Sequence, residues 1–173
     1  LDGRFRRGVP DENLRLLGAE GRPNSLDLLY GQAQRPRLRG VAVVAPAIDD
    51  AGLQALAAAG VVGIRLNLIG LALPDPRTPA WQSLLARVNA LGWHVQVHVQ
   101  AARLAHIMPA LLQAGCRVVV DHFGRPDPAL GVADPGFGYL LRQAASGQVW
   151  VKLSAPYRNW TRAACASAGR GGA

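Results

Sequence analysis

The sequence has little of several features that would mark a specialised class of protein. Of its 173 residues, 17% are charged and 6% aromatic, while half are apolar, which is the composition of a single globular domain. Proline (12) and glycine (20) are too few for a disordered or collagen-like chain. No apolar run reaches the roughly 18 residues of a membrane span. No apolar leader follows the first residues, so we expect a cytoplasmic protein.

Cysteine and lysine are scarce as well. Cys116 and Cys165 lie far apart in the chain and cannot form a metal knuckle by themselves, so we expect buried thiols. The 19 basic residues exceed the 11 acidic ones, which gives a net charge of +8, but every basic residue except Lys152 is an arginine. No aromatic stripe accompanies them, as a nucleic-acid surface would require. The expected partner is a small molecule, with neither a membrane nor a nucleic acid involved.

From residue 40 onward, β-branched apolar runs alternate with amphipathic segments, which indicates a βα protein. The predicted strands cover residues 41–45, 61–68, 93–99, 116–122 and 149–154. The predicted helices run from an Asp49 or Asp50 cap to Ala59, from Thr78 to Leu91, from Ala101 to Ala114 with a kink or restart at Pro109, and from Gly136 to Ser146. Residues 1–39 do not match this pattern, and we expect residues 159–173 to form a divergent or disordered tail.

Five strands joined by helices fit an open doubly wound sheet or part of a (β/α)8 barrel. No strand leads into a glycine-rich phosphate loop, and that absence favours the barrel. Nearly every strand carries polar residues toward its carboxyl end, namely Arg65, Asn67, Gln96, His98, His122, Lys152 and Ser154. Because residues two apart on a strand share a face, we expect these side chains to meet at one barrel mouth.

Four segments in the same order resemble the amidohydrolase-related (amidohydrolase 2) family of barrel hydrolases and decarboxylases. They are Gly60–Asn67, Val95–His98, Val119–Asp127 and Val149–Arg158. The Asp-His-Phe-Gly-Arg-Pro and Val-Lys-Leu-Ser sequences within them are most similar to the 2-pyrone-4,6-dicarboxylate lactonase-like branch. The resemblance spans about residues 40–158 and implies an incomplete TIM barrel with about strands three to seven. Since a full barrel takes about 250 residues, we interpret the chain as a partial or frame-disrupted member.

The resemblance also implies roles for individual residues. His122 matches the active-site histidine of the family, which coordinates a divalent metal such as zinc or manganese, or polarises a lactone carbonyl without one. An imidazole can do either. Arg65, Arg125 and Arg158 match arginines that hold substrate carboxylates, a task that suits a planar, permanently charged group. The structural alternatives are a histidine bound to the backbone and surface ion pairs.

Lys152 is the second catalytic candidate, and it could stabilise a transition state or simply neutralise Asp121. The remaining candidates for substrate contact are Asn67, His98, Ser154 and Tyr157. Hydroxyl groups at strand ends can instead satisfy the backbone. We expect His94 to be structural and assign no role to His106.

Three departures from the family pattern bear on activity. No histidine precedes His94, so the His-x-His pair of the first strand is absent, and no acid follows Asp134, so the final aspartate that serves as general base is absent too. Leu71 stands where the lactonase carries a second arginine. The predicted function is hydrolysis of a lactone of a small carboxylated substrate. A metal-dependent decarboxylase, a catalytically inactive fragment and self-association through open sheet edges stay open.

Overall fold

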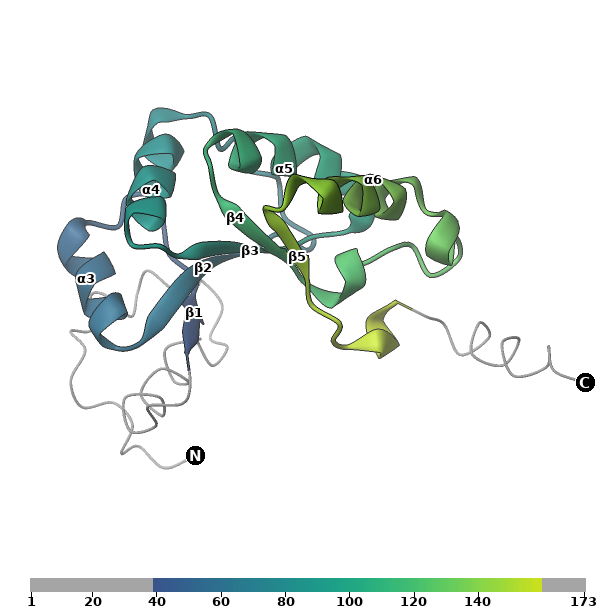
Figure 1. Ribbon diagram of the computed structural model, residues 1–173, viewed down its shortest axis with the longest axis horizontal. Coiled ribbons are helices and arrows are strands. Elements are labelled where there is room, and N and C mark those ends of the chain that lie inside the picture. Colours follow the sequence, from purple (N-terminus) through teal and green to yellow (C-terminus); the bar gives the residue numbers. More distant parts are fainter. Residues whose placement is uncertain (1–38, 160–173) are drawn as a thin grey trace, which may run out of the picture.

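Five parallel strands in consecutive order form the centre of the protein. The computed structural model describes residues 39–159 (Figure 1). The strands are β1 (Gly40–Ala42), β2 (Val61–Asn67), β3 (His94–His98), β4 (Arg117–Val120) and β5 (Val149–Val151). They pair in the order β1-β2-β3-β4-β5, and every pair is parallel. A doubly wound sheet reverses its strand order at a switch point, whereas consecutive order is the arrangement of a barrel segment.

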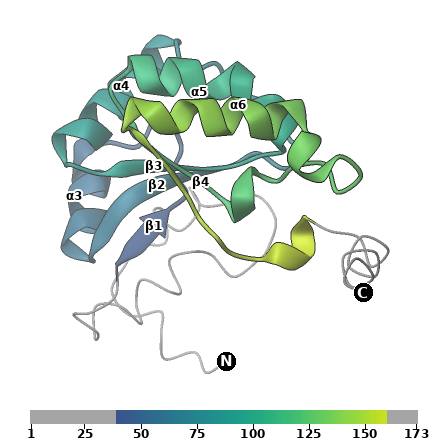
Figure 2. The ribbon, with the colours of Figure 1, turned by 45° about the vertical axis from the view of Figure 1, so that its right-hand side comes forward.

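Four α-helices lie on one face of this sheet, as Figures 1 and 2 both show. They are α3 (Asp50–Ala58), α4 (Pro79–Ala90), α5 (Leu104–Gln113) and α6 (Pro135–Gln143). Short 3₁₀ turns cover residues 101–103, 122–124, 131–133, 144–146 and 156–158. Each helix joins two neighbouring parallel strands, so the carboxyl ends of all five strands lie at the same edge of the sheet.

The helices begin largely where the sequence predicts. Asp49 caps α3 by accepting a 2.8 Å hydrogen bond from the backbone N–H of Gly52. Thr78 precedes α4 as expected but makes no side-chain cap, because its hydroxyl donates to the Asp75 carbonyl instead. Of the two alternatives predicted at Pro109, a kink or a restart, the restart is wrong, since α5 continues through that residue as one helix.

The core lies between the sheet and its helices. Val95 and Val97 of β3 and Val118 and Val120 of β4 are fully buried. They belong to the same apolar cluster as helix residues Leu84, Leu85, Ile107, Met108 and Leu111. Cys116 is buried, as predicted.

Several predictions concern residues at or beyond the limits of what the structure describes. Cys165 and nearly all of the segments 1–39 and 159–173 lie outside the described residues, so the proposed boundaries at these segments stay predictions. Between residues 39 and 159, no helix is long and apolar enough to cross a membrane.

Candidate active site

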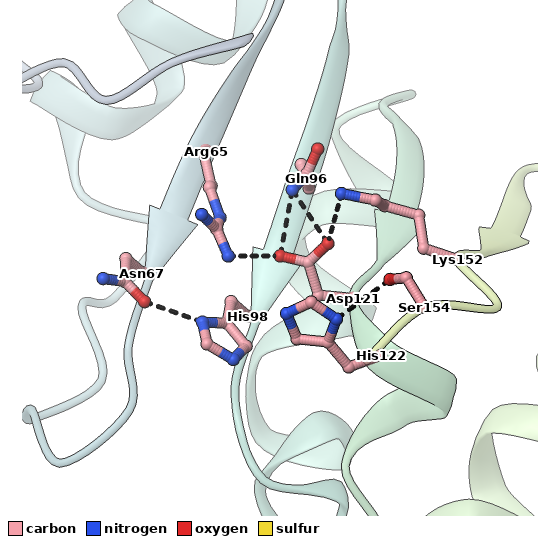
Figure 3. A network of polar contacts seen from close by, with 8 residues as sticks. All are labelled: Arg65, Asn67, Gln96, His98, Asp121, His122, Lys152 and Ser154. Atoms are coloured by element: carbon pink, nitrogen blue, oxygen red, sulfur yellow. Dashed lines mark hydrogen bonds and ion pairs between the residues drawn. The ribbon is translucent and has the colours of Figure 1, made fainter. Parts of the chain in front are cut away.

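A buried carboxylate lies at the centre of the polar groups at the strand ends. Asp121 directly follows β4 and is 1% exposed. Its Oδ2 accepts a 2.6 Å hydrogen bond from Nη2 of Arg65 on β2. Both its oxygens accept bonds from Nε2 of Gln96 on β3, at 2.8 and 2.9 Å, and Nζ of Lys152 lies 3.0 Å from Oδ1. Figure 3 shows the three donors converging on this carboxylate.

The surroundings of Asp121 favour its ionised form. Burial alone raises the pKa of the Asp121 carboxyl, but the hydrogen bond from Gln96 and the charges of Arg65 and Lys152 outweigh burial and lower the pKa below its ordinary value. The carboxylate therefore carries its charge at neutral pH. The cations Arg65 and Lys152 both pair with the single anion Asp121, so the cluster carries a net positive charge. Nε of Arg65 is also buried and has no hydrogen-bond partner among the described residues.

Two imidazoles lie beside this cluster. Nδ1 of His98 is 2.8 Å from Oδ1 of Asn67, and Nδ1 of His122 is 2.9 Å from Oγ of Ser154. The two rings stand nearly perpendicular, at 87°, with their centroids 5.0 Å apart. Figure 3 shows both rings next to the carboxylate cluster. The predicted sharing of faces is confirmed for Arg65 with Asn67 and for Gln96 with His98.

Both imidazoles are neutral at neutral pH. Burial and the charge of Arg65 lower the pKa of His98 to about 4, although Asp121 acts in the opposite direction. Burial also lowers the pKa of His122. The charges of Arg158, Lys152 and Arg65 lower it further, whereas the charge of Asp121 raises it. A neutral imidazole carries one N–H donor and one acceptor lone pair. Each ring can therefore serve as a hydrogen-bond donor or as a proton acceptor, according to its tautomer.

The placement of His122 on a strand is wrong. β4 ends at Val120, and His122, Phe123, Gly124 and Arg125 all have positive φ, between 52° and 78°. This left-handed turn is held by a bond from the Phe123 N–H to the Lys152 carbonyl and by the Asn159 side chain, which donates to the His122 carbonyl. Non-glycine residues rarely adopt this conformation, and such strain is common at functional sites. The turn, not strand alternation, directs the His122 ring.

The predicted strand from Val149 to Ser154 is also too long. β5 ends at Val151, although the Lys152 N–H still donates to the Val120 carbonyl. Because the Lys152 carbonyl accepts from the left-handed turn, the chain leaves the sheet at this point. Both residues nevertheless belong to the site, because Lys152 contacts Asp121 and Ser154 contacts His122.

The other predicted substrate residues lie at the margin of the cluster. Arg125 is close enough for its charge to lower the pKa of His98, and Arg158 acts in the same way on His122. The guanidinium of Arg158 lies 5.5 Å from the ring centre of Tyr157, which is 75% exposed. Within residues 39–159, none of the three makes a side-chain hydrogen bond to the cluster.

Sequence reasoning did not select Asp121 and Gln96 as site residues. Asp121 appeared only as an acid that Lys152 could neutralise, and Gln96 only as a polar residue on a strand. The available signal was the position of Asp121, directly between a fully apolar strand and the candidate His122. An acid there must find cationic partners, because an unpaired buried charge is very costly.

The described residues do not supply a metal site. No group of three or more His, Cys, Asp or Glu side chains in this part of the chain could hold a metal ion. Both Asp121 oxygens are already occupied by nitrogen donors, and each imidazole has one nitrogen engaged. The Nε2 atoms of His98 and His122 are the ring nitrogens left free, and two ligands are fewer than the three protein ligands of a catalytic zinc site, so the described residues alone do not fit such an ion. Metal binding by His122 stays a prediction.

Comparisons with known proteins place the chain in a family. A family model described as Amidohydrolase matches residues 4–170. The chain belongs to the amidohydrolase family. It is 37% identical over 123 residues to 2-pyrone-4,6-dicarboxylate hydrolase of Comamonas testosteroni, covering 70% of this chain and 40% of that relative. It is 26% identical over 142 residues to 4-sulfomuconolactone hydrolase of Hydrogenophaga intermedia, covering 78% and 45%.

A solved structure agrees with both the family and the fold. It is an Acinetobacter baumannii protein described as a "probable 2-pyrone-4,6-dicarboxylic acid hydrolase" with citric acid bound, at 40% identity and a TM-score of 0.75. The match covers 80% of this chain and 52% of that one. The family prediction and the partial barrel-like fold are therefore confirmed. This amidohydrolase chain spans about half the length of the relatives that it matches.

Proposed function

We propose that this amidohydrolase opens the ring ester of a small carboxylated lactone by hydrolysis. The observation that carries the proposal is the meeting of two neutral imidazoles with the cationic cluster around Asp121. The names of the two curated relatives support it, because each denotes a hydrolase of a cyclic ester that carries acidic groups. Citric acid in the related structure is a polycarboxylate, which is consistent with a site that accepts anionic oxygens.

The substrate carboxylate is held by arginines. Nε of Arg65 is a buried donor without a partner among the described residues, so a carboxylate oxygen would satisfy it. Arg125 is close enough to His98, and Arg158 to His122, for their charges to lower the pKa of these imidazoles, so both add positive charge near the site. Asp121 keeps the Arg65 side chain in place through its bond to Nη2. Tyr157 and Asn67 are the remaining candidates for polar contact with the ring.

The ester carbonyl is polarised by His122. If the Ser154 hydroxyl donates to Nδ1 of the neutral ring, the ring hydrogen is on Nε2 and can bond to the carbonyl oxygen. That bond strengthens as negative charge develops on the oxygen during attack by water. Lys152 contributes a positive charge near the developing oxyanion while its ammonium also binds Asp121. These steps use only side chains of this chain.

The number of acidic groups on the substrate is a separate question. Leu71 occupies the place where the resemblance implies a second carboxylate-binding arginine, and its side chain is 59% exposed. A lactone with one carboxylate therefore fits better than a dicarboxylate. 2-Pyrone-6-carboxylate and 2-pyrone-4,6-dicarboxylate are the matched pair of substrates that distinguishes these possibilities.

The test is ring opening by the purified protein, followed by loss of pyrone absorbance and by chromatography of the product, with EDTA, zinc or manganese added in parallel. We expect hydrolysis above the buffer rate, and a KM raised about 10- to 100-fold by Arg65→Met through loss of charged hydrogen bonds. Arg77→Met removes an exposed arginine and serves as the control. Carbon dioxide release would identify a decarboxylase instead, and absence of both products would identify an inactive fragment.

A further inference from the structure

The segment that follows β5 contacts the left-handed turn at His122 through three hydrogen bonds. The Lys152 carbonyl accepts a 3.0 Å bond from the Phe123 N–H, directly after His122. Oγ of Ser154 lies 2.9 Å from Nδ1 of the His122 ring, as Figure 3 shows. Nδ2 of Asn159 donates to the His122 carbonyl at 3.0 Å. The same short segment therefore contacts both the ring and the backbone of His122.

Asn159 differs from its neighbours in burial. Pro156, Tyr157 and Arg158 form an exposed 3₁₀ turn, whereas Asn159 is only 1% exposed. The Asn159 N–H closes this turn by donating to the Pro156 carbonyl at 2.9 Å, and its side chain lies beneath the turn against His122. Asparagine is mostly an exposed residue, because burial of a polar group is costly unless that group is hydrogen-bonded. A buried asparagine after three exposed residues therefore calls for a specific role.

The side-chain amide of Asn159 forms only part of its possible hydrogen bonds. The His122 carbonyl can only accept, so Asn159 must present its nitrogen to it. Oδ1 of Asn159 is then buried without a hydrogen-bond partner among the described residues. The free energy gained from one hydrogen bond is offset by the cost of an unsatisfied buried acceptor. Asn159 therefore contributes little net stability to the fold.

The bond from Asn159 acts on a strained part of the backbone. His122 has a φ of 52°, and the three residues after it also have positive φ. An L-residue keeps this conformation only where its surroundings hold it. Both Asn159 and the Arg125 N–H donate to the His122 carbonyl and so fix the peptide group that follows the His122 Cα. Because the backbone dihedrals determine which side-chain rotamers are allowed, this bond also determines where the His122 ring points.

We propose that Asn159 is a positioning residue that holds the His122 ring in the orientation needed to polarise the ester carbonyl. The inference rests on the function proposed above. Ser154 binds the ring at one atom, and a single bond leaves the ring free to tilt about it. Asn159 fixes the backbone from which the ring projects. It acts through His122 and touches no reacting atom itself.

The kinetic test compares the same substitution at two asparagines. Nδ2 of Asn89 also donates to a backbone carbonyl, that of Ala114, at 2.7 Å. Asn89 lies near the end of α4 and Ala114 shortly before β4, so this bond is at the amino edge of the sheet, opposite the site. With 2-pyrone-6-carboxylate as the probe, we expect Asn159→Leu to lower kcat about 10- to 100-fold with little change in KM. Asn89→Leu should leave both constants unchanged.

The two kinetic constants distinguish an effect on His122 from an effect on the neighbouring Arg158. A raised KM with an unchanged kcat in Asn159→Leu would mean that Asn159 positions Arg158 for the carboxylate, and would overturn the inference. A kcat equal to that of the wild type would also overturn it. Asn159→Asp is the second variant, since it keeps the size of the side chain but replaces the donor with an oxygen that repels the His122 carbonyl. We expect kcat to fall at least as far as in Asn159→Leu.

Urea unfolding separates positioning from a structural role. Because the Asn159 amide leaves Oδ1 unsatisfied, Asn159→Leu should lose no more stability than Asn89→Leu. A clearly larger loss in Asn159→Leu would show that Asn159 mainly holds the fold, and would overturn the inference.

A spectroscopic measurement needs no turnover. Long-range ¹H–¹⁵N correlation spectra of the whole protein report which ring nitrogen of each histidine is protonated. We expect one tautomer of His122 in the wild type and a mixture in Asn159→Leu, because the displaced ring loses its bond to Ser154. The signals of His98, whose ring contacts Asn67, should stay unchanged. Unchanged His122 signals in Asn159→Leu would overturn the inference. Should the wild type open no lactone while the His122 signals change as expected, the proposed function fails and the positioning of the ring by Asn159 stands.

Discussion

On strand β3, alternate side chains lie in two environments that are almost equally buried from solvent. Val95 and Val97 are fully buried on the side of the helices, whereas Gln96 and His98, at 5% and 7% exposure, face the polar cluster. The apolar side needs suitable volume and tolerates exchange among similar hydrophobic residues. The polar side needs a specific partner for each atom, because a buried donor or acceptor without one is costly.

The difference shows that burial alone does not measure how strongly a position depends on its neighbours. A buried valine of β3 is stabilised by many van der Waals contacts, each of which contributes little free energy. Asp121 is stabilised by three donors, on β2, on β3 and just past β5. Removing one group therefore has different consequences on the two sides of the sheet.

The largest effect is expected from Asp121→Asn. This change leaves Arg65 and Lys152 without their shared counter-charge; because these side chains are 28% and 43% exposed, we expect a cost of about 3 kcal/mol, the lower end for breaking a buried ion pair. Urea unfolding should show this loss in the free energy of unfolding. Asp50→Asn is the matched control, since the Asp50 side chain is 82% exposed and lies 3.3 Å from Arg87. A surface pair contributes at most about 1 kcal/mol, so equal losses in the two variants would contradict the comparison.

The apolar side is tested by Leu111→Ala. Leu111 lies on α5 and is fully buried, and truncating such a side chain costs about 3 kcal/mol through lost burial and the cavity left behind. Leu111→Met should recover most of this loss because it conserves volume. Leu141→Ala, at a position that is 58% exposed, is the control and should change stability by less than about 0.5 kcal/mol. A large loss in Leu111→Met would mean that the apolar side is as specific as the polar side.

The polar side also gives stability a dependence on pH. The pKa of His98 is about 4 in the folded protein against an ordinary value of 6.5, so below pH 6.5 the unfolded chain binds the proton more readily. Stability is therefore present above pH 6.5 and is lost as the pH falls toward 4. Lowering the pH from 7 to 5 should cost about 2 kcal/mol from His98 alone. Urea unfolding at the two pH values measures the loss.

The variant His98→Gln isolates this contribution. It should reduce the loss of stability between pH 7 and pH 5, and what persists should come from His94 and His122, whose pKa values are also lowered by burial. Asp121 affects the stability of the fold over a different range of pH. Its lowered pKa stabilises the fold above the ordinary carboxyl value of 3.8, and that stability is lost only as the pH falls below about 4. If the free energy of unfolding of His98→Gln depended on pH as strongly as that of the wild type, the assignment of this pH dependence to His98 would be contradicted.

The two sides of the sheet were not equally predictable from the sequence. The apolar strands and most helix starts follow from local patterns, such as the alternation around Val95 and the Asp49 cap before α3. The strand-end positions of Arg65, Asn67 and His98 also follow, because side chains alternate along a strand. These predictions need only neighbouring residues in the chain.

The central role of Asp121 could not be derived in the same way. It depends on Arg65, which is 56 positions away in the chain, and on the register of the strands that carry the partners. The left-handed turn at His122 was missed because Phe123 and Arg125 are not residues that favour positive φ, and the local cues are limited to Gly124 and the weaker preference of His122. Tertiary bonds to Lys152 and Asn159 hold that turn.

The smallest effect is expected where a polar contact is local and exposed. Asp49→Ala removes the cap of α3 and should cost about 1 kcal/mol, whereas Asp49→Asn keeps an accepting oxygen for the Gly52 N–H and should cost a few tenths. Thermal or urea unfolding of the two variants makes the measurement. Water can replace a lost partner at an exposed helix start, but no water replaces the Asp121 carboxylate between two cations. A loss in Asp49→Ala as large as that in Asp121→Asn would show that this distinction between solvated and enclosed polar contacts is wrong.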